Sequence, residues 1–264
     1  MIIPGEGGVG KSKTIQSITE NFYRLGKGDL LVKGAYTGIA SSVIDGKTLH
    51  VLAMIPLNGR QQSSQTQKKL VDFWQSKQYF IINEMSMVSQ DLFAKLSRII
   101  SQARKSNELS NTDQPFGGMN VILVGDFHQF PPVVTKKSAP LYWPCNSLKD
   151  TTNEILGRQI YEQFDVVVQL KTQVRVIDPD WVELLQHVRH GNCKERHLRL
   201  LRDMILGHAN CPPTDFTTAP WNQAVLITPR HAVRMQWNTM MANTQCKLKS
   251  KSRQSLDEVI CINR

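Results

Sequence analysis

Short runs of apolar residues recur along the chain, and glycine or polar and acidic residues bound each of them. Apolar runs this short, with such flanks, predict buried β-strands. The strands predicted in the first part of the chain are Met1–Ile3, Leu30–Ala35, Tyr79–Ile82, Val121–Val124 and Val166–Leu170.

Between the predicted strands, apolar positions recur every three or four residues, which is the period of an amphipathic helix. This spacing predicts helices over Lys11–Leu25 and Gln90–Ala103, and Gly26 suits the C-terminal end of the first. Polar stretches at Asn58–Gln67 and Asn107–Gly118 predict loops. Because strands alternate with helices, we expect an α/β fold: a parallel sheet with helices on both of its faces.

The pattern restarts after about residue 170. A helix is predicted over Trp181–Arg189, a strand over Ala224–Thr228 and a second helix over His231–Ala242. We therefore expect two domains, covering residues 1–170 and 171–264.

The charge of the chain favours polyanionic partners. Among its 264 residues, 32 Lys and Arg outweigh 22 Asp and Glu, for a formal net charge of +10. The densest basic cluster forms a predicted tail: Lys247, Lys249, Lys251 and Arg253. Such a cluster is either a solvated tail or a contact with phosphates.

The composition also argues against several classes of protein. No stretch approaches the roughly 20 apolar residues of a membrane helix, so we expect no membrane partner. The first residues do not form a secretory signal. The five cysteines are scattered and form no metal-binding pair, so we expect reduced thiols in an intracellular protein.

The strongest chemical signal is a phosphate-binding loop (P-loop), which fits G-x-x-x-x-G-K-[ST]. Its residues are Gly5, Glu6, Gly7, Gly8, Val9, Gly10, Lys11 and Ser12. The glycines let backbone N–H groups turn toward phosphate oxygens, and the following helix directs its positive end to the same place. Lys11 would neutralise β- and γ-phosphate charge, and the Ser12 hydroxyl would bind Mg²⁺.

Two further tracts place polar residues at the ends of predicted strands. Asn83 and Glu84 follow Tyr79–Ile82, where Glu84 is a candidate general base. Asn83 stands where an aspartate is usual, so we expect weakened Mg²⁺ binding or hydrolysis. Asp126 and Gln129 follow Val121–Val124, and the Gln129 amide can both contact a γ-phosphate and orient water.

The ordered tracts GEGGVGKS, AYTGIASS, GKTLH, INEMSM, VGDFHQFPPV and LKTQVRV give the chain a family resemblance. It resembles the Pif-type (petite integration frequency) ATP-dependent DNA helicases of superfamily one, especially the fungal branch associated with Helitron-like elements. The resemblance implies a RecA-like P-loop NTPase domain and an incomplete second RecA-like domain. It also implies ATP and Mg²⁺ as cofactors, and 5′-to-3′ translocation on single-stranded DNA.

The resemblance also implies roles for single residues. Lys11, Glu84, Gln129 and Arg175 match the family's catalytic positions, Arg175 being the arginine that reaches the γ-phosphate from the second domain. Ser12, Asn83 and Glu84 match its metal site. Thr37, Thr48 and His50 match segments that line the DNA track, although a purely structural role is an alternative for each. Nuclear residence, and roles in DNA repair, recombination or telomere maintenance, are likewise implied by the family.

Three departures from the family pattern leave alternatives open. Asn83 replaces the expected aspartate, the sequence begins just before the P-loop, and it stops before the later family motifs. We therefore expect a fragment or a decayed gene copy, with an apolar face left exposed. The first alternative is a nucleotide-binding remnant without unwinding activity, and the second, based on the P-loop alone, is a small-molecule kinase.

Overall fold

The structure is a computed structural model. It describes residues 1–55, 63–105, 113–133, 139–146, 148–219 and 221–248. The chain divides into two compact units, one up to residue 192 and one from residue 193 onward. The predicted loops at Asn58–Gln67 and Asn107–Gly118 lie partly outside the described residues, and Lys249, Lys251 and Arg253 lie wholly outside them. The first loop prediction is wrong from Ser64 onward, because α4 begins there.

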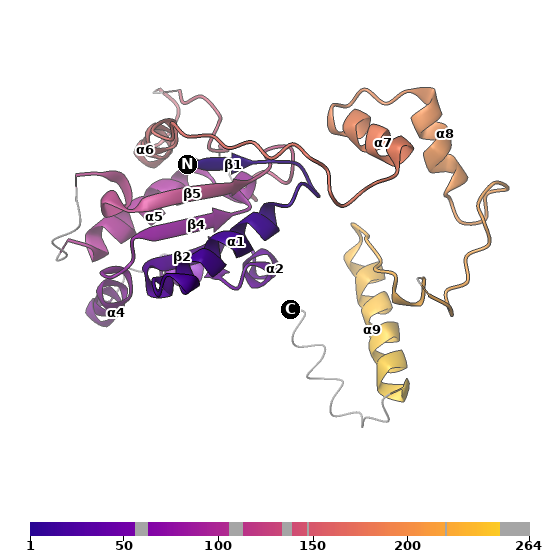
Figure 1. Ribbon diagram of the computed structural model, residues 1–264, viewed down its shortest axis with the longest axis horizontal. Helices are drawn as coiled ribbons and strands as arrows, with labels where there is room; N and C mark the ends of the chain where they lie inside the picture. Colours follow the sequence, from indigo (N-terminus) through magenta and orange to yellow (C-terminus); the bar gives the residue numbers. More distant parts are fainter. Residues whose placement is uncertain (56–62, 106–112, 134–138, 147, 220, 249–264) are drawn as a thin grey trace. The chain divides into compact units, whose positions relative to one another are not determined.

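The first unit is built on five parallel strands in the order β1-β5-β4-β2-β3 (Figure 1). Their bounds are β1 Ile2–Pro4, β2 Leu31–Ala35, β3 Lys47–Thr48, β4 Tyr79–Asn83 and β5 Asn120–Gly125. The predicted parallel α/β sheet is thus confirmed, and four of the predicted strands match β1, β2, β4 and β5. β3 was not predicted, because two residues are too few to form a pattern.

The fifth predicted strand, Val166–Leu170, runs beside the free edge of β1. The Ile2 N–H donates to the Val166 carbonyl (2.8 Å), and the Val168 N–H donates to the Ile2 carbonyl (2.9 Å). The Leu170 N–H continues this parallel pairing with the Pro4 carbonyl (3.0 Å). The chain therefore returns to the strand that leads into the P-loop.

The other regular elements of the described residues are helices and short turns. In the first unit they are α1 Lys11–Arg24, α2 Gly38–Val43, α3 Leu49–Leu52, α4 Ser64–Trp74, α5 Gln90–Ala103, α6 Thr152–Glu162 and α7 Pro179–Arg189. Short 3₁₀ turns are η1 Gly28–Leu30, η2 Met85–Met87 and η3 Pro115–Gly118. The second unit contains α8 Glu195–Asp203, η4 Trp221–Gln223 and α9 His231–Leu248. The four predicted helices correspond to α1, α5, α7 and α9.

Alternate residues of each strand face opposite sides of the sheet, so helices cover both faces (Figure 1). Phe80 and Ile82 of β4 pack with the apolar face of α5. Ile81, between them, packs on the other side with Ile15 of α1. This double burial explains why β4 reads as a continuous apolar run.

The second unit differs from its predicted form. The predicted strand Ala224–Thr228 is wrong, since residues 193–219 and 221–248 contain no strand. Val225 is 85% exposed and Ile227 93% exposed, so neither a neighbouring strand nor a core covers this run. Residues 171–192 belong to the first compact unit, and the division into domains 1–170 and 171–264 stays a prediction.

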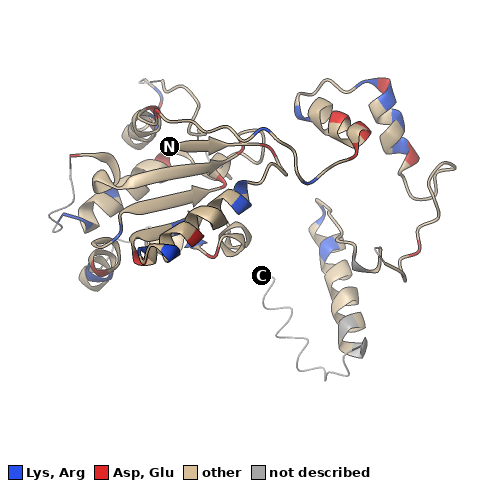
Figure 2. Cartoon of the chain, viewed as in Figure 1, with Lys and Arg blue, Asp and Glu red and all other residues tan. Residues whose placement is uncertain are grey.

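Charged residues of both signs are interspersed along the helices (Figure 2). In α8, for example, Glu195 and Asp203 flank the arginines of the same helix. None of the helices in the described residues combines the length and apolar character that a bilayer crossing requires.

Candidate nucleotide site

The predicted P-loop connects β1 to α1. Gly8 and Gly10 adopt φ values of +94° and +90°, which side chains of L-residues rarely allow. Gly10 is the residue immediately before α1, so the helix begins at Lys11 and its free N–H groups face the loop. The strand–loop–helix arrangement expected from the motif is present, and it is the geometry that suits an anion.

Lys11 folds back over this loop. Its Nζ donates to the carbonyls of Gly5 and Glu6, at 2.8 Å each. Burial lowers the pKa of Lys11, the carboxylates of Asp126 and Glu84 oppose that shift, and Arg175 adds to it. The structure therefore brings Glu84, Asp126 and Arg175 within electrostatic range of the P-loop lysine.

Asn83 and Glu84 stand at the carboxyl end of β4. Asn83 is buried and pairs with Ala35 of β2 and Val124 of β5. Glu84 turns the chain out of the strand with φ 57° and ψ 51°, a left-handed conformation that costs a non-glycine residue about 1–2 kcal/mol. Such strain is characteristic of functional sites. In the described structure the hydroxyl of Ser86, just beyond, is buried without a hydrogen-bond partner.

Asp126 and Gln129 form a turn after β5. The Gln129 N–H donates to the Asp126 carbonyl (2.9 Å), and the His128 N–H donates to Asp126 Oδ1 (3.1 Å). Gln129 Nε2 lies 3.9 Å from the position that a Cβ on Gly7 would take. The candidate γ-phosphate sensor therefore lies beside the P-loop.

The segment that follows Leu170 reaches the same loop. Gln173 Nε2 donates to the Gly7 carbonyl (2.8 Å), and the Val174 N–H donates to the Gly8 carbonyl (3.0 Å). A Cβ on Gly8 would overlap Gln173 Oε1 and would lie 3.0 Å from the Arg175 Cβ. Arg175 is exposed at this position. Gly8 is thus required both by its backbone angle and by this close approach.

Helix α7 makes contacts with the site that the sequence did not predict. The Arg189 guanidinium donates from two nitrogens to Asp126 Oδ2 (2.7 Å) and Oδ1 (2.6 Å). Its Nε lies 3.5 Å from Glu6 Oε1, and Gln186 Nε2 donates to Glu6 Oε2 (2.5 Å). Burial acts to raise the pKa of Asp126, but the hydrogen bonds from Arg189 and His128 hold it below its ordinary value. No local pattern could reveal pairs so far apart in sequence.

The three predicted DNA-track residues lie elsewhere on the sheet, next to β2 and β3. The Thr37 hydroxyl accepts the Ala40 N–H (3.2 Å) and caps α2, and the Thr48 hydroxyl accepts the Val51 N–H (3.4 Å) and caps α3. The His50 ring packs edge-on against Tyr36. The two threonines therefore have a structural task, while each hydroxyl keeps a proton that it can donate.

The candidate residues thus fall into two groups. Glu84, Gln129 and Arg175 lie around the P-loop at the carboxyl ends of β1, β4 and β5, and the P-loop itself contributes Lys11 and Ser12 from the first turn of α1. Thr37 follows β2, Thr48 is the last residue of β3 and His50 comes just after it, at the opposite end of the strand order. The carboxyl edge of a parallel sheet is where ligands bind in open α/β folds.

Comparison with known proteins relates this chain to a family of helicases. The model of the PIF1-like helicase family matches residues 1–198. The ATP-dependent DNA helicase RRM3 of Saccharomyces cerevisiae is 36% identical over 205 residues, covering 76% of this chain and 26% of RRM3. Human ATP-dependent DNA helicase PIF1 is 32% identical over 203 residues, covering 75% and 28%. The chain spans about a quarter of the length of these relatives.

Solved structures show the same fold. The Pif1 helicase from Candida albicans superposes with a TM-score of 0.64 at 24% identity, over 96% of this chain and 51% of that one. A Bacteroides Pif1 helicase, solved in complex with ADP-AlF3 and ssDNA, gives a TM-score of 0.65 at 23% identity, over 91% and 52%. Since the family model covers well over half of the sequence, the chain belongs to the PIF1-like helicase family.

Proposed function

We propose that this chain forms the ATP-binding part of a DNA helicase, in which ATP hydrolysis drives movement along single-stranded DNA. The observation that carries the proposal is the convergence of Lys11, Glu84, Gln129 and Arg175 on a P-loop preceding α1. The family relatives named above are ATP-dependent DNA helicases, and one of the solved relatives holds ADP-AlF3 and ssDNA. By analogy with the yeast and human relatives, we place the protein in the nucleus.

Each residue has a distinct task in this proposal. The P-loop amides bind the phosphates, and Lys11 exchanges the Gly5 and Glu6 carbonyls for β- and γ-phosphate oxygens. Glu84 takes the proton of the attacking water as general base, and Gln129 contacts the γ-phosphate. Arg175 stabilises the charge that develops during transfer. Thr37, Thr48 and His50 contribute to the single-stranded DNA track, where backbone contact needs little sequence readout.

Mg²⁺ fits the donors present, which are all oxygen atoms: the Ser12 hydroxyl, the Glu84 carboxylate and the Asn83 side-chain carbonyl. Asp126 already has a cationic partner, since both of its carboxylate oxygens accept hydrogen bonds from Arg189. When bound, the ion neutralises phosphate charge. Because Asn83 supplies an oxygen without a negative charge, we expect the chain to need more Mg²⁺ than a variant with aspartate there.

The proposal is tested by measuring ATP hydrolysis by the whole chain with and without single-stranded DNA. We expect DNA to accelerate hydrolysis and Lys11→Ala to reduce the accelerated rate by about a hundredfold or more, since it removes a charge aimed at the transferred group. Lys13→Ala is the matched control, because Lys13 is an exposed lysine in the same turn of α1. Hydrolysis that responds neither to DNA nor to the loss of Lys11 would contradict the proposal.

A second candidate function, a nucleotide-binding remnant without turnover, is favoured only by Asn83. Under it, calorimetry shows ATP binding by a chain that does not hydrolyse ATP. Asn83→Asp separates two causes. Recovered turnover identifies the missing carboxylate as the defect, whereas unchanged inactivity excludes it as the sole cause.

A further inference from the structure

One guanidinium outside the predicted motifs holds two parts of the nucleotide site together. Arg189, the last residue of α7, donates two hydrogen bonds to Asp126 and lies beside Glu6 of the P-loop. Asp126 is 3% exposed, so its charge depends on this partner rather than on water. A bidentate arginine–carboxylate contact of this kind fixes the orientation of the carboxylate as well as compensating its charge.

What Asp126 fixes in turn is the position of Gln129. The carboxylate and carbonyl of Asp126 accept the N–H groups of His128 and Gln129, so Asp126 defines the turn that carries the sensor. Glu6 belongs to the loop that binds the phosphates, and a hydrogen bond from Gln186 of α7 holds it as well. The His128 ring also packs against His190, just after α7, with centroids 5.9 Å apart. Helix α7 therefore fixes the position of the turn at residues 126–129, which carries Gln129, relative to the P-loop.

We propose that Arg189 is a positioning residue for γ-phosphate recognition. Through its contacts with Asp126 and Glu6, it holds Gln129 at a distance from the P-loop that allows the site to distinguish ATP from ADP. Arg189 has no contact with nucleotide in this proposal. The inference rests on the proposed function, since it presupposes that the P-loop binds ATP.

The test compares the affinities of the whole chain for ADP and for a non-hydrolysable ATP analogue, both with Mg²⁺, so it does not depend on turnover. Arg189→Gln should leave ADP affinity within about twofold and reduce the preference for the ATP analogue by about tenfold, a typical coupling between linked sites. Asp126→Asn should reduce the preference in the same direction, and the double variant should lose no more than Arg189→Gln alone, because both changes break the Arg189–Asp126 contact.

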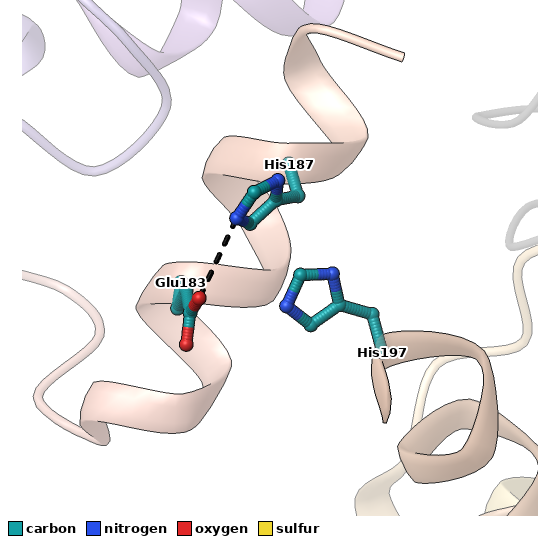
Figure 3. A group of neighbouring side chains, drawn as sticks. All are labelled: Glu183, His187 and His197. Carbon is teal, nitrogen blue, oxygen red and sulfur yellow. Dashed lines mark ion pairs between the residues drawn. The ribbon is translucent and has the colours of Figure 1, made fainter. Parts of the chain in front are cut away.

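Glu183→Gln is the control on the same helix. Glu183 pairs with His187 one turn away, with 3.4 Å between Oε1 and Nε2, on α7 (Figure 3). This variant should keep the wild-type preference for the ATP analogue. If Arg189→Gln does not fold, Arg189→Lys serves instead. It keeps the charge but loses the bidentate geometry, so the preference for the ATP analogue should fall by a smaller factor.

Three outcomes would overturn the inference: an unchanged preference in Arg189→Gln (or in Arg189→Lys if it alone folds), additive losses in the double variant, or an equal loss in Glu183→Gln. A wild-type chain that binds neither nucleotide overturns the proposed function itself. The two failures are therefore distinguishable.

Discussion

Isoleucines in the two compact units have opposite environments although their local sequences are alike. Ile81 lies in the run YFII and Ile227 in the run AVLIT, and both runs are rich in residues that favour strands. Ile81 is 0% exposed, because β4 pairs with β2 and β5 and α1 covers its face of the sheet. Ile227 is 93% exposed. The comparison teaches that neighbouring elements, rather than the run itself, determine whether an apolar segment becomes a core strand.

The largest change in stability should come from truncating the buried isoleucine, and truncating the exposed isoleucine provides the comparison. Ile81→Ala removes buried methyl groups and leaves a cavity, so the free energy of unfolding should fall by about 2–5 kcal/mol. Ile227→Ala should change it by no more than about 0.5 kcal/mol, because an exposed side chain loses little on truncation. Denaturant unfolding of both variants measures the difference. Equal losses would show that the second unit buries this residue after all.

Ion pairs allow the same comparison between a buried group of the first unit and an exposed group of the second, with a smaller expected change in stability. The Asp126–Arg189 pair of the first unit is buried at its carboxylate, so Asp126→Asn should lower the free energy of unfolding at pH 7 by about 1.5–3 kcal/mol. The folded pKa of Asp126 lies below the ordinary 3.8. Its stabilising effect is therefore complete above that pH and is lost as the pH falls through the folded pKa. Unfolding of wild type and variant from pH 7 to pH 2 should show the gap closing only below about pH 4.

The second unit supplies the matched pair for that experiment. Arg202 and Glu195 of α8 lie 2.7 Å apart, but their side chains are 57% and 61% exposed. Glu195→Gln should therefore change the free energy of unfolding by no more than about 0.5 kcal/mol. A gap for Asp126→Asn that stays constant down to pH 2, or one no larger than that of Glu195→Gln, would contradict the role given to the buried pair.

Local pattern predicted the fold well where tertiary partners exist. β1, β2, β4 and β5 and all four predicted helices are present, because short apolar runs and helical spacing are properties of the sequence itself. The strand at Ala224–Thr228 failed because strand pairing requires a partner that the described part of the second unit does not provide. The short elements α2 and α3 were missed, since helices of so few residues leave little periodic pattern, and the longer α4, α6 and α8 were not predicted either.

The candidate site shows the same limit. The P-loop could be found from spacing alone, because its glycines and lysine are consecutive in sequence. Arg189 and Gln186 could not: Arg189 meets Asp126 across 63 positions, and Gln186 meets Glu6 across 180. In sequence both residues look like ordinary polar positions of an amphipathic helix. Thr37 and Thr48 were found as candidate DNA contacts, but their capping bonds become visible only in the structure.

The central claim is that the loop at residues 5–12 binds a triphosphate with Gln129 beside it. Amide hydrogen exchange of the whole chain, with and without a non-hydrolysable ATP analogue and Mg²⁺, tests this most directly. We expect exchange to slow in residues 5–12 and 126–129 of the first unit, where N–H groups gain phosphate partners or a fixed turn. Binding of the analogue with unchanged exchange in residues 5–12, or with protection confined to residues 193–248, would contradict the claim.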